Sequence, residues 1–231
     1  MKNSVLLLSA ILFTFSMQGQ IQTPASSPSA HMEQMVGLTD VTIEYSRPSM
    51  KGRTVFGNLV PFGKIWRTGA NANTTISFST DVTVDGQKLN KGTYAIYTKP
   101  EKDSWEVYFY SETDNGGLPQ KWDDSKVVAK VSAKVYPMSM SVESFTISLD
   151  DLTSESAVLG ILWEKTYVGV KFEVPTDATV MNNINQVMGG PTAQDYYAAA
   201  VYYMDSGKDI AQAKKWIDKS AAMTEKPAFW Q

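Results

Sequence analysis

The stretch YVGVKFEV, residues 167–174, alternates apolar residues with other residues along its whole length. Because a strand points successive side chains to opposite faces of a sheet, one face of this stretch would be apolar and the other solvated. The apolar face carries Val168, Val170, Phe172 and Val174. This pattern is typical of a half-buried strand, and it predicts an antiparallel sheet with one face on the core.

Similar short runs recur before that stretch, separated by turns rich in Gly, Pro, Asp and Asn rather than by helices. They lie at residues 41–45, 76–84, 94–98, 105–110, 127–136, 141–149 and 156–163. About eight or nine short strands without intervening helices favour an antiparallel β-sandwich or a flattened barrel over a parallel α/β fold. We expect this mainly β domain to span residues 36–176.

The periodicity changes after Pro175. Apolar or small residues recur at helical spacing in three segments of residues 177–231. The last two segments, separated by Asp205, Ser206 and Gly207, resemble one tetratricopeptide-type helical hairpin. Because arrays of this type need about three repeats to bury themselves, we expect the hairpin to pack on the β-domain or on further helix.

The N-terminal sequence predicts export. Residues 1–19 have the layout of a cleavable signal peptide: Lys2, an apolar run, and then small and polar residues. The run is too short for a membrane span, so we expect a periplasmic or extracellular protein that is soluble after signal removal. Residues 20–35, rich in Pro, Ser, Ala and Gln without periodicity, predict a flexible leader.

The amino-acid inventory excludes several kinds of chemistry. The chain has no cysteine, which rules out disulfides and a lipid-anchored cysteine, and its one histidine, His31, lies in the predicted leader. We therefore expect no Ser/His/Asp or Cys/His catalysis, no metal and no other cofactor. The net charge of -3 argues against nucleic acid and anionic membrane as partners, because both depend on a basic surface.

Residues 52–75, GRTVFGNLVPFGKIWRTGANANTT, differ from their flanks in composition. Their glycines are spaced too irregularly for a phosphate loop. Their apolar residues predict a long Ω-like loop that is anchored to the sandwich by buried side chains, here called pegs. We call residues 47–75 the basic segment, because this interval has no Asp or Glu and holds five cations. The cations are Arg47, Lys51, Arg53, Lys64 and Arg67.

Two interpretations of the basic segment stay open. In the first, it binds a ligand: Arg53 and Arg67 clamp an anion, because a guanidinium offers a planar fork of donors to carboxylate, phosphate or sulfate. Lys51 and Arg47 add positive potential, and Asn71 orients the ligand. In the second, the arginines only tie the loop down by pairing with carboxylates from elsewhere in the chain. These carboxylates would be Asp81, Asp150 or Asp151.

Three phrases of the sequence carry a resemblance to a known family. They are SRPSMKGRTVFGNLVPFGKIWRTGAN (46–71), DVTVDGQKLNKGTYAIYTKP (81–100) and WEKTYVGVKFEV (163–174). Over roughly residues 36–176 the chain resembles the exported bacterial family catalogued as domain of unknown function 2911. The resemblance implies export and a β-rich domain, and it brings no established activity. Members often have GANEATT where this chain has GANANTT, so an acid used there by relatives would be absent here.

The tryptophans and one acidic turn offer further candidates. Trp105 and Trp163 lie in alternating strands and are interpreted as core residues. Trp122, in a polar loop, is a candidate for stacking on a sugar or for capping one end of the sandwich. Glu112 and Asn115 belong to an oxygen-rich turn without the calcium-loop pattern, which we interpret as a plain turn.

Three hypotheses of function follow. The first is a periplasmic binding or scaffold protein with a cationic, amide-lined pocket for a small anionic or polyhydroxylated ligand, such as a carbohydrate. The second is a hydrolase of envelope sugars or peptides that uses carboxylates and a bound water, although nothing in the sequence selects the pair. The third is a structural interaction module that captures a protein partner through its helical tail, residues 177–231.

Overall fold

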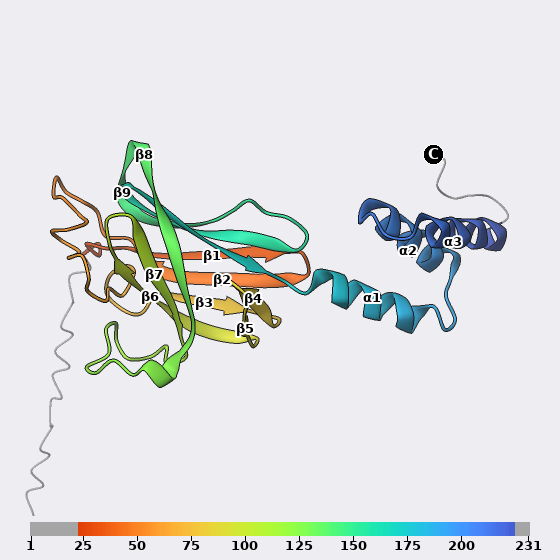
Figure 1. Cartoon of the computed structure of the whole chain (residues 1–231), viewed down its shortest axis with the longest axis horizontal. Helices are drawn as coiled ribbons and strands as arrows, with labels where there is room; N and C mark the ends of the chain where they lie inside the picture. Colours follow the sequence, from red (N-terminus) through yellow and green to blue (C-terminus); the bar gives the residue numbers. More distant parts are fainter. Residues whose placement is uncertain (1–22, 225–231) are drawn as a thin grey trace, which may run out of the picture.

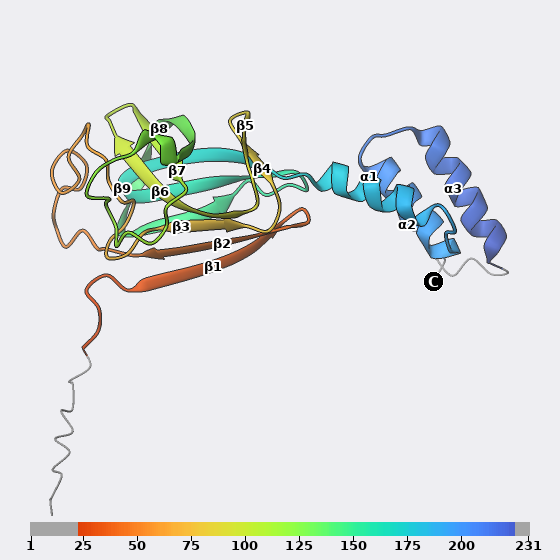
Figure 2. The same cartoon turned by 90° about the horizontal axis from the view of Figure 1, so that it is seen from below.

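The computed structural model describes residues 23–224, which form one nine-stranded sheet followed by three helices (Figures 1 and 2). All pairs of neighbouring strands are antiparallel. The prediction of a mainly β, antiparallel domain with C-terminal helices is therefore confirmed. The predicted signal peptide, residues 1–19, and the last part of the predicted helical tail, residues 225–231, lie outside the described residues.

The sheet contains the stretch that alternates so strictly in the sequence. Its strands are β1 Ser29–Val36, β2 Thr39–Ser46, β3 Thr75–Phe78, β4 Val82–Val84, β5 Gln87–Leu89, β6 Gly92–Pro100, β7 Ser104–Tyr110, β8 Val127–Asp150 and β9 Ser156–Glu173. Their order across the sheet is β1-β2-β3-β6-β7-β8-β9-β4-β5. Residues 167–173 form the second half of β9, where burial alternates as predicted.

Some strands of the structure have different boundaries from the alternating runs of the sequence. Runs 127–136 and 141–149 merge into β8, whose register with β9 shifts between Pro137 and Val142. Such an irregularity absorbs extra residues without reversing the chain, so two short strands become one long one. The run 76–84 instead splits into β3 and β4, which pair at different places in the sheet.

The sheet is open but folds over, so that two parts of it face each other across one core. Tyr45 of β2 contacts Phe145 of β8, with ring centroids 5.8 Å apart. Phe78 of β3 contacts Phe172 of β9 at 5.4 Å, although neither pair of strands is adjacent in the sheet. The largest fully buried side chains of the described residues all belong to this β-domain.

The boundary predicted for the leader is wrong. β1 begins at Ser29, inside the segment expected to be flexible, and pairs along its whole length with β2. β1 is an edge strand whose side chains, apart from the buried Val36, alternate between exposed and half-buried, so its sequence shows no strong apolar alternation. His31 lies in this strand, 58% exposed, with its Nδ1 3.4 Å from the Glu44 carboxylate.

Three helices extend from one end of the sheet: α1 Thr176–Val187, α2 Ala193–Asp205 and α3 Ile210–Met223. The start of α1 packs against the turn between β1 and β2. A side chain at Gly37 would collide with the Thr176 hydroxyl and the Ser154 carbonyl, and Gly37 has φ +56°, so this junction requires glycine. Apart from Thr176, α1 has no buried residue.

Helices α2 and α3 pack on each other as an antiparallel hairpin that lies away from the sheet (Figures 1 and 2). Thr192 and Asp195 form a capping box at the start of α2, and Asp209 caps α3. Of the two expected partners, the β-domain and further helix, the hairpin contacts a further helix: Tyr202 and Lys208 both bond to Asp177 of α1. None of the helices within residues 23–224 is long and apolar enough to cross a membrane.

Candidate functional site

The basic segment connects β2 to β3 at the end of the sheet opposite the helices (Figure 1). Val55 and Val60 are buried in the core at 0% and 4% exposure, as the predicted pegs require. Trp66 exchanges two backbone hydrogen bonds with Thr98 of β6, at 2.7 and 3.0 Å. The segment is therefore held at several points, and its polar side chains start from fixed backbone positions.

Five aromatic rings pack together where the basic segment meets the core: Phe56, Trp66, Trp105, Phe145 and Trp163. Trp66 stacks on Trp163 with 5.9 Å between ring centroids and 20° between planes. Trp105 and Trp163 are 1% and 2% exposed, which confirms their interpretation as core residues. The Trp66 indole donates to the Gly69 carbonyl at 3.2 Å, and the Trp163 indole donates to the Glu143 carbonyl at 3.1 Å.

A hollow of about 420 Å³ lies between the basic segment and its neighbours. Three of the five predicted site residues line it: Lys51, Arg53 and Arg67. The other lining residues are Ser26, Ser27, Pro48, Ser49, Leu59, Val60, Trp66, Gly69, Ala70, Leu118 and Trp163. No Asp or Glu stands among these lining residues, all of which lie in the part of the chain that the structure describes. We call this space the cationic hollow.

Arg53 is fixed by the turn that precedes it. Its Nε donates to the Met50 carbonyl at 2.8 Å, and its Nη2 donates to the Ser49 carbonyl at 2.7 Å. A guanidinium carries about five N–H donors in one plane, so two such bonds set the plane and leave the remaining donors for a ligand. The neutral carbonyls do not cancel the positive charge.

Arg67 and Lys51 are held more lightly. The Nη1 of Arg67 donates to the Asn71 carbonyl at 3.2 Å. Gly117 lies against this guanidinium with φ +118°, and a Cβ there would come within 2.8 Å of Nη1. The backbone N–H of Lys51 donates to Glu143 Oε1 at 2.8 Å. Within residues 23–224, no ion pair joins these two side chains to a carboxylate.

The structure does not bring Arg47 and Asn71 to the cationic hollow. The Nε of Arg47 donates to the Phe145 carbonyl at 3.0 Å, and its Nη2 donates to the Thr146 hydroxyl at 2.8 Å. These bonds tie the end of β2 to β8. Asn71, at φ +59°, donates its side-chain amide to the Ser27 carbonyl and the Ser46 hydroxyl. Both side chains fasten the segment instead of lining its hollow.

Two of the three carboxylates named as partners for the arginines, Asp81 and Asp150, bond elsewhere. Asp81 accepts from the backbone N–H of Lys91 and pairs with Lys88 at 2.9 Å, and these contacts lower its pKa. Asp150 accepts hydrogen bonds from the Ser148 and Tyr167 hydroxyls. The pKa of Tyr167 is raised to about 12, mainly by burial and secondly by the negative charge of Asp150. Within residues 23–224 no arginine forms an ion pair with any carboxylate, so the proposed pairing with Asp81, Asp150 or Asp151 is wrong.

A buried polar network that the sequence did not predict holds one wall of the hollow. The Tyr97 hydroxyl donates to the Gly117 carbonyl at 2.6 Å and accepts from the Asn73 amide at 2.9 Å. The Gly117 N–H in turn donates to Asn73 Oδ1 at 2.6 Å, which places the next residue, Leu118, against the hollow. Burial raises the pKa of Tyr97. These residues are at least twenty positions apart, so no local spacing could reveal them.

Trp122 packs over the face of β6 and β7 that points away from the main core, against Tyr97, Tyr108 and Tyr110. It is half-buried, and its ring lies 4.9 Å from that of Tyr110 and 5.2 Å from that of Tyr108. The oxygen-rich turn beside it is also tied internally, because Glu112 pairs with Lys126 at 2.7 Å. Among residues 23–224 no group of three or more His, Cys, Asp or Glu side chains could hold a metal ion.

Residues 27–172 match the model of the family described as Protein of unknown function (DUF2911). The chain belongs to the DUF2911 family. No match to a curated protein or to a solved structure was found. The DUF2911 region covers nearly all of the sheet and all but one of the residues that line the cationic hollow, whereas α1, α2 and α3 lie beyond it.

Proposed function

We propose that this DUF2911 protein is an exported binding protein that holds a small anionic or polyhydroxylated ligand in the cationic hollow. One observation carries the proposal: Lys51, Arg53 and Arg67 line the same hollow, and no acidic residue is among its lining residues. Three cations around one space repel each other, and an anion between them removes that repulsion. The proposed export rests on the signal-like residues 1–19.

The way the cations are held favours binding. Because two carbonyl oxygens already fix Arg53 and a third restrains Arg67, less side-chain freedom is lost when a ligand arrives. Charge-assisted hydrogen bonds are also about twice as strong as neutral ones. The serine hydroxyls and the half-buried Trp66 ring of the lining suit the hydroxyl groups and apolar face of a sugar. An anionic sugar therefore matches both the cations of the lining and its serine and tryptophan side chains.

The hydrolase hypothesis has less support than binding, because three cations line the hollow and no carboxylate is among its lining residues. A glycoside hydrolase needs two carboxylates across the scissile bond. Glu143 lies beside the hollow, but its Oε1 accepts the Lys51 N–H, and it does not line the space. Glu164 similarly accepts the backbone N–H of Val55 at 3.2 Å. We therefore put forward binding, and not hydrolysis, as the function.

The test is a calorimetric titration with D-glucuronate, which carries both a carboxylate and sugar hydroxyls. We expect wild-type protein to bind glucuronate, and Arg67→Ala to bind it about 10–100-fold more weakly, because one charge-assisted interaction is lost. The melting temperature should change little, since Arg67 makes a single 3.2 Å bond within its own loop.

Lys64→Ala is the matched control, because Lys64 is an exposed cation of the same segment that does not line the hollow. D-glucose is the matched probe without the carboxylate, and it should bind more weakly than glucuronate. Equal affinity of the wild type and Arg67→Ala for glucuronate would refute the proposal, as would the absence of binding of glucuronate, citrate and sulfate to the wild type.

A further inference from the structure

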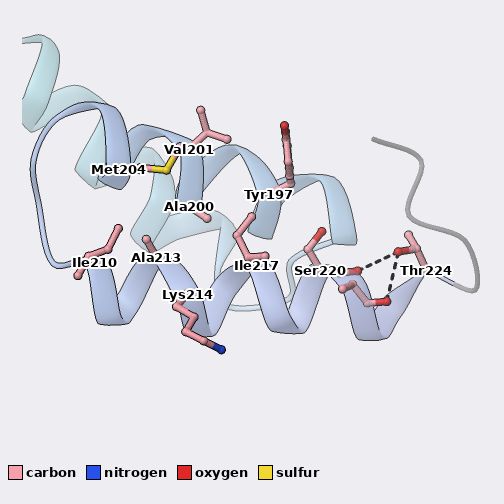
Figure 3. Close-up of a pocket in the computed structure, with 11 residues that line it drawn as sticks. Tyr197, Ala200, Val201, Met204, Ile210, Ala213, Lys214, Ile217, Ser220 and Thr224 are labelled. Carbon is pink, nitrogen blue, oxygen red and sulfur yellow. Dashed lines mark hydrogen bonds between the residues drawn. The ribbon is translucent and has the colours of Figure 1, made fainter. Parts of the chain in front are cut away.

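The hairpin of α2 and α3 carries an apolar groove that differs in kind from the cationic hollow. The groove has a volume of about 640 Å³ and runs along the seam between the two helices (Figure 3). Ala200 of α2 and Ala213 and Ile217 of α3 lie along this seam. Most of the residues that line it are apolar, so an apolar occupant would fit it.

The hairpin does not bury its own large apolar residues. The buried residues of α2 and α3 are all small: Ala199, Ala200, Ala213 and Ser220. In contrast, Met204, Ile210 and Ile217 are 57%, 65% and 39% exposed. Because two helices with small residues at their crossing leave such side chains on the outside, a third element is needed to cover them.

The chain itself leaves α3 at this groove. Thr224, the C-terminal cap of α3, has extended backbone angles and lines the groove. Its hydroxyl donates to the Ser220 carbonyl at 3.1 Å, which fixes the point of departure (Figure 3). The next seven residues are EKPAFWQ and include Pro227, Phe229 and Trp230. Phe and Trp are the side chains that bury the most apolar area, at roughly 150–250 Å² each.

The length of this segment suits the groove. Phe229 is five positions beyond Thr224, which gives a reach of up to roughly 17 Å in an extended chain. Ile217 is seven residues back along α3, or about 10 Å at the rise of a helix. Phe229 can therefore reach the middle of the groove without strain, and Pro227 limits the freedom that the segment would lose.

The groove could be filled by residues 225–231 or by a second copy of the protein, and attachment to the same chain favours residues 225–231. A short tether gives its end an effective concentration of about millimolar at the groove. At micromolar protein, a second copy would need an affinity about a thousandfold higher to compete. We propose that residues 225–231 occupy the groove between α2 and α3, with Phe229 and Trp230 packed against Ile217, and so complete the helical unit within one chain.

The absence of cysteine makes a disulfide test simple. The full chain with Ile217→Cys and Phe229→Cys is oxidised at micromolar concentration, and the product is measured by non-reducing electrophoresis and mass spectrometry. The control pairs Phe229→Cys with Lys215→Cys. Lys215 is also exposed on α3, but two positions away, so it faces roughly 200° around the helix. Because a disulfide requires Cβ atoms about 4 Å apart, only the pair in contact closes readily.

We expect the Ile217/Phe229 pair to close within one chain at least tenfold faster than the Lys215/Phe229 pair. Similar rates for the two pairs would overturn the proposal. Disulfide-linked dimers as the main product of the Ile217/Phe229 pair would overturn it in favour of a second copy.

A second measurement does not rely on a new cysteine. Wild-type protein should bind the dye ANS weakly, and Trp230→Ser should increase its fluorescence severalfold by opening the groove. Tyr136→Ser, which removes an aromatic ring that is 51% exposed on β8, is the control and should leave the fluorescence unchanged. Unchanged fluorescence in Trp230→Ser would contradict the proposal.

Discussion

The β-domain and the α2–α3 hairpin bury apolar side chains in opposite ways. Trp105, Trp163 and Phe145 are almost fully buried in the β-domain, whereas the hairpin buries alanine and serine and exposes isoleucine and methionine. The folded-over sheet surrounds its core from both sides, but two helices have only one contact face each. The β-domain is thus complete within the described residues, while the hairpin needs a further element.

The largest expected effect comes from a cavity in the β-domain. Phe145, 0% exposed, contacts Tyr45, Trp66 and Trp163, so Phe145→Ala should lower the free energy of unfolding by about 3–5 kcal/mol. Ile210→Ala, at a side chain that is 65% exposed on the hairpin, should cost less than about 1 kcal/mol. Urea unfolding of both variants measures the contrast. Similar losses of unfolding free energy in the two variants would contradict the difference between the β-domain and the hairpin.

The next largest loss of unfolding free energy is expected from removing the hydrogen bonds of Arg47 to β8. Arg47→Ala removes two hydrogen bonds and leaves the half-buried Phe145 carbonyl and Thr146 hydroxyl without this partner, so it should cost about 1–3 kcal/mol. Its affinity for glucuronate should stay close to the wild-type value, because Arg47 does not line the hollow. Denaturation and calorimetry on the same samples separate the two effects. A stable variant that has lost binding would place Arg47 in the site.

A smaller effect is expected at the joint between α1 and α2. The Tyr202 hydroxyl donates to Asp177 Oδ1 at 2.6 Å, and Lys208 pairs with the same carboxylate at 2.7 Å. Tyr202→Phe removes one half-exposed bond and should cost less than about 1 kcal/mol. Amide hydrogen exchange should rise in α1 and α2 and stay unchanged in the β-domain. Faster exchange in the sheet would show that the two regions are coupled more strongly than their contacts suggest.

The smallest effect is a pH dependence within the sheet. Hydrogen bonds from Tyr108 and then Lys130 lower the pKa of Glu106 from its ordinary 4.5 to about 2. A lowered folded-state pKa stabilises the protein above pH 4.5, and this contribution is lost as the pH falls from 4.5 towards 2. Glu106 is 34% exposed, so solvent screens part of the effect.

Glu106→Gln should therefore flatten the fall in stability between pH 4.5 and 2, measured as the urea midpoint at each pH. Glu155→Gln, at an exposed carboxylate, gives the effect of removing one negative charge and should leave the slope as in the wild type. A wild-type slope in Glu106→Gln would show that this carboxylate does not carry the pH dependence.

The sequence predicts elements best where one face of a strand is buried. Residues 167–173 alternate in burial as they alternate in hydropathy, because β9 has the core on one side. β1 was missed because it lies at the edge of the sheet, where Ala30 and Met32 are only half-buried and polar residues are tolerated on both faces. The position of the helices also escaped prediction, since helical spacing does not say what a helix packs against.

At the candidate site, the sequence identified the basic segment but not how each cation is used. Lys51, Arg53 and Arg67 line one hollow, and Arg47 does not. Arg47 is tied to a backbone carbonyl of β8, and a carbonyl acceptor leaves no mark on the sequence because every residue has one. The network of Tyr97, Asn73 and Gly117 escaped prediction because only the fold brings its members together.

The central claim, that two arginines face a shared ligand while the third fastens the fold, has one direct test. The chain contains three arginines, Arg47, Arg53 and Arg67, so their Nε–H groups give three assignable signals in a ¹⁵N NMR spectrum. On addition of glucuronate, the signals of Arg53 and Arg67 should shift together with one dissociation constant, and that of Arg47 should stay in place. A shift of Arg47 equal to the others, or no shift of Arg53 and Arg67, would contradict the account.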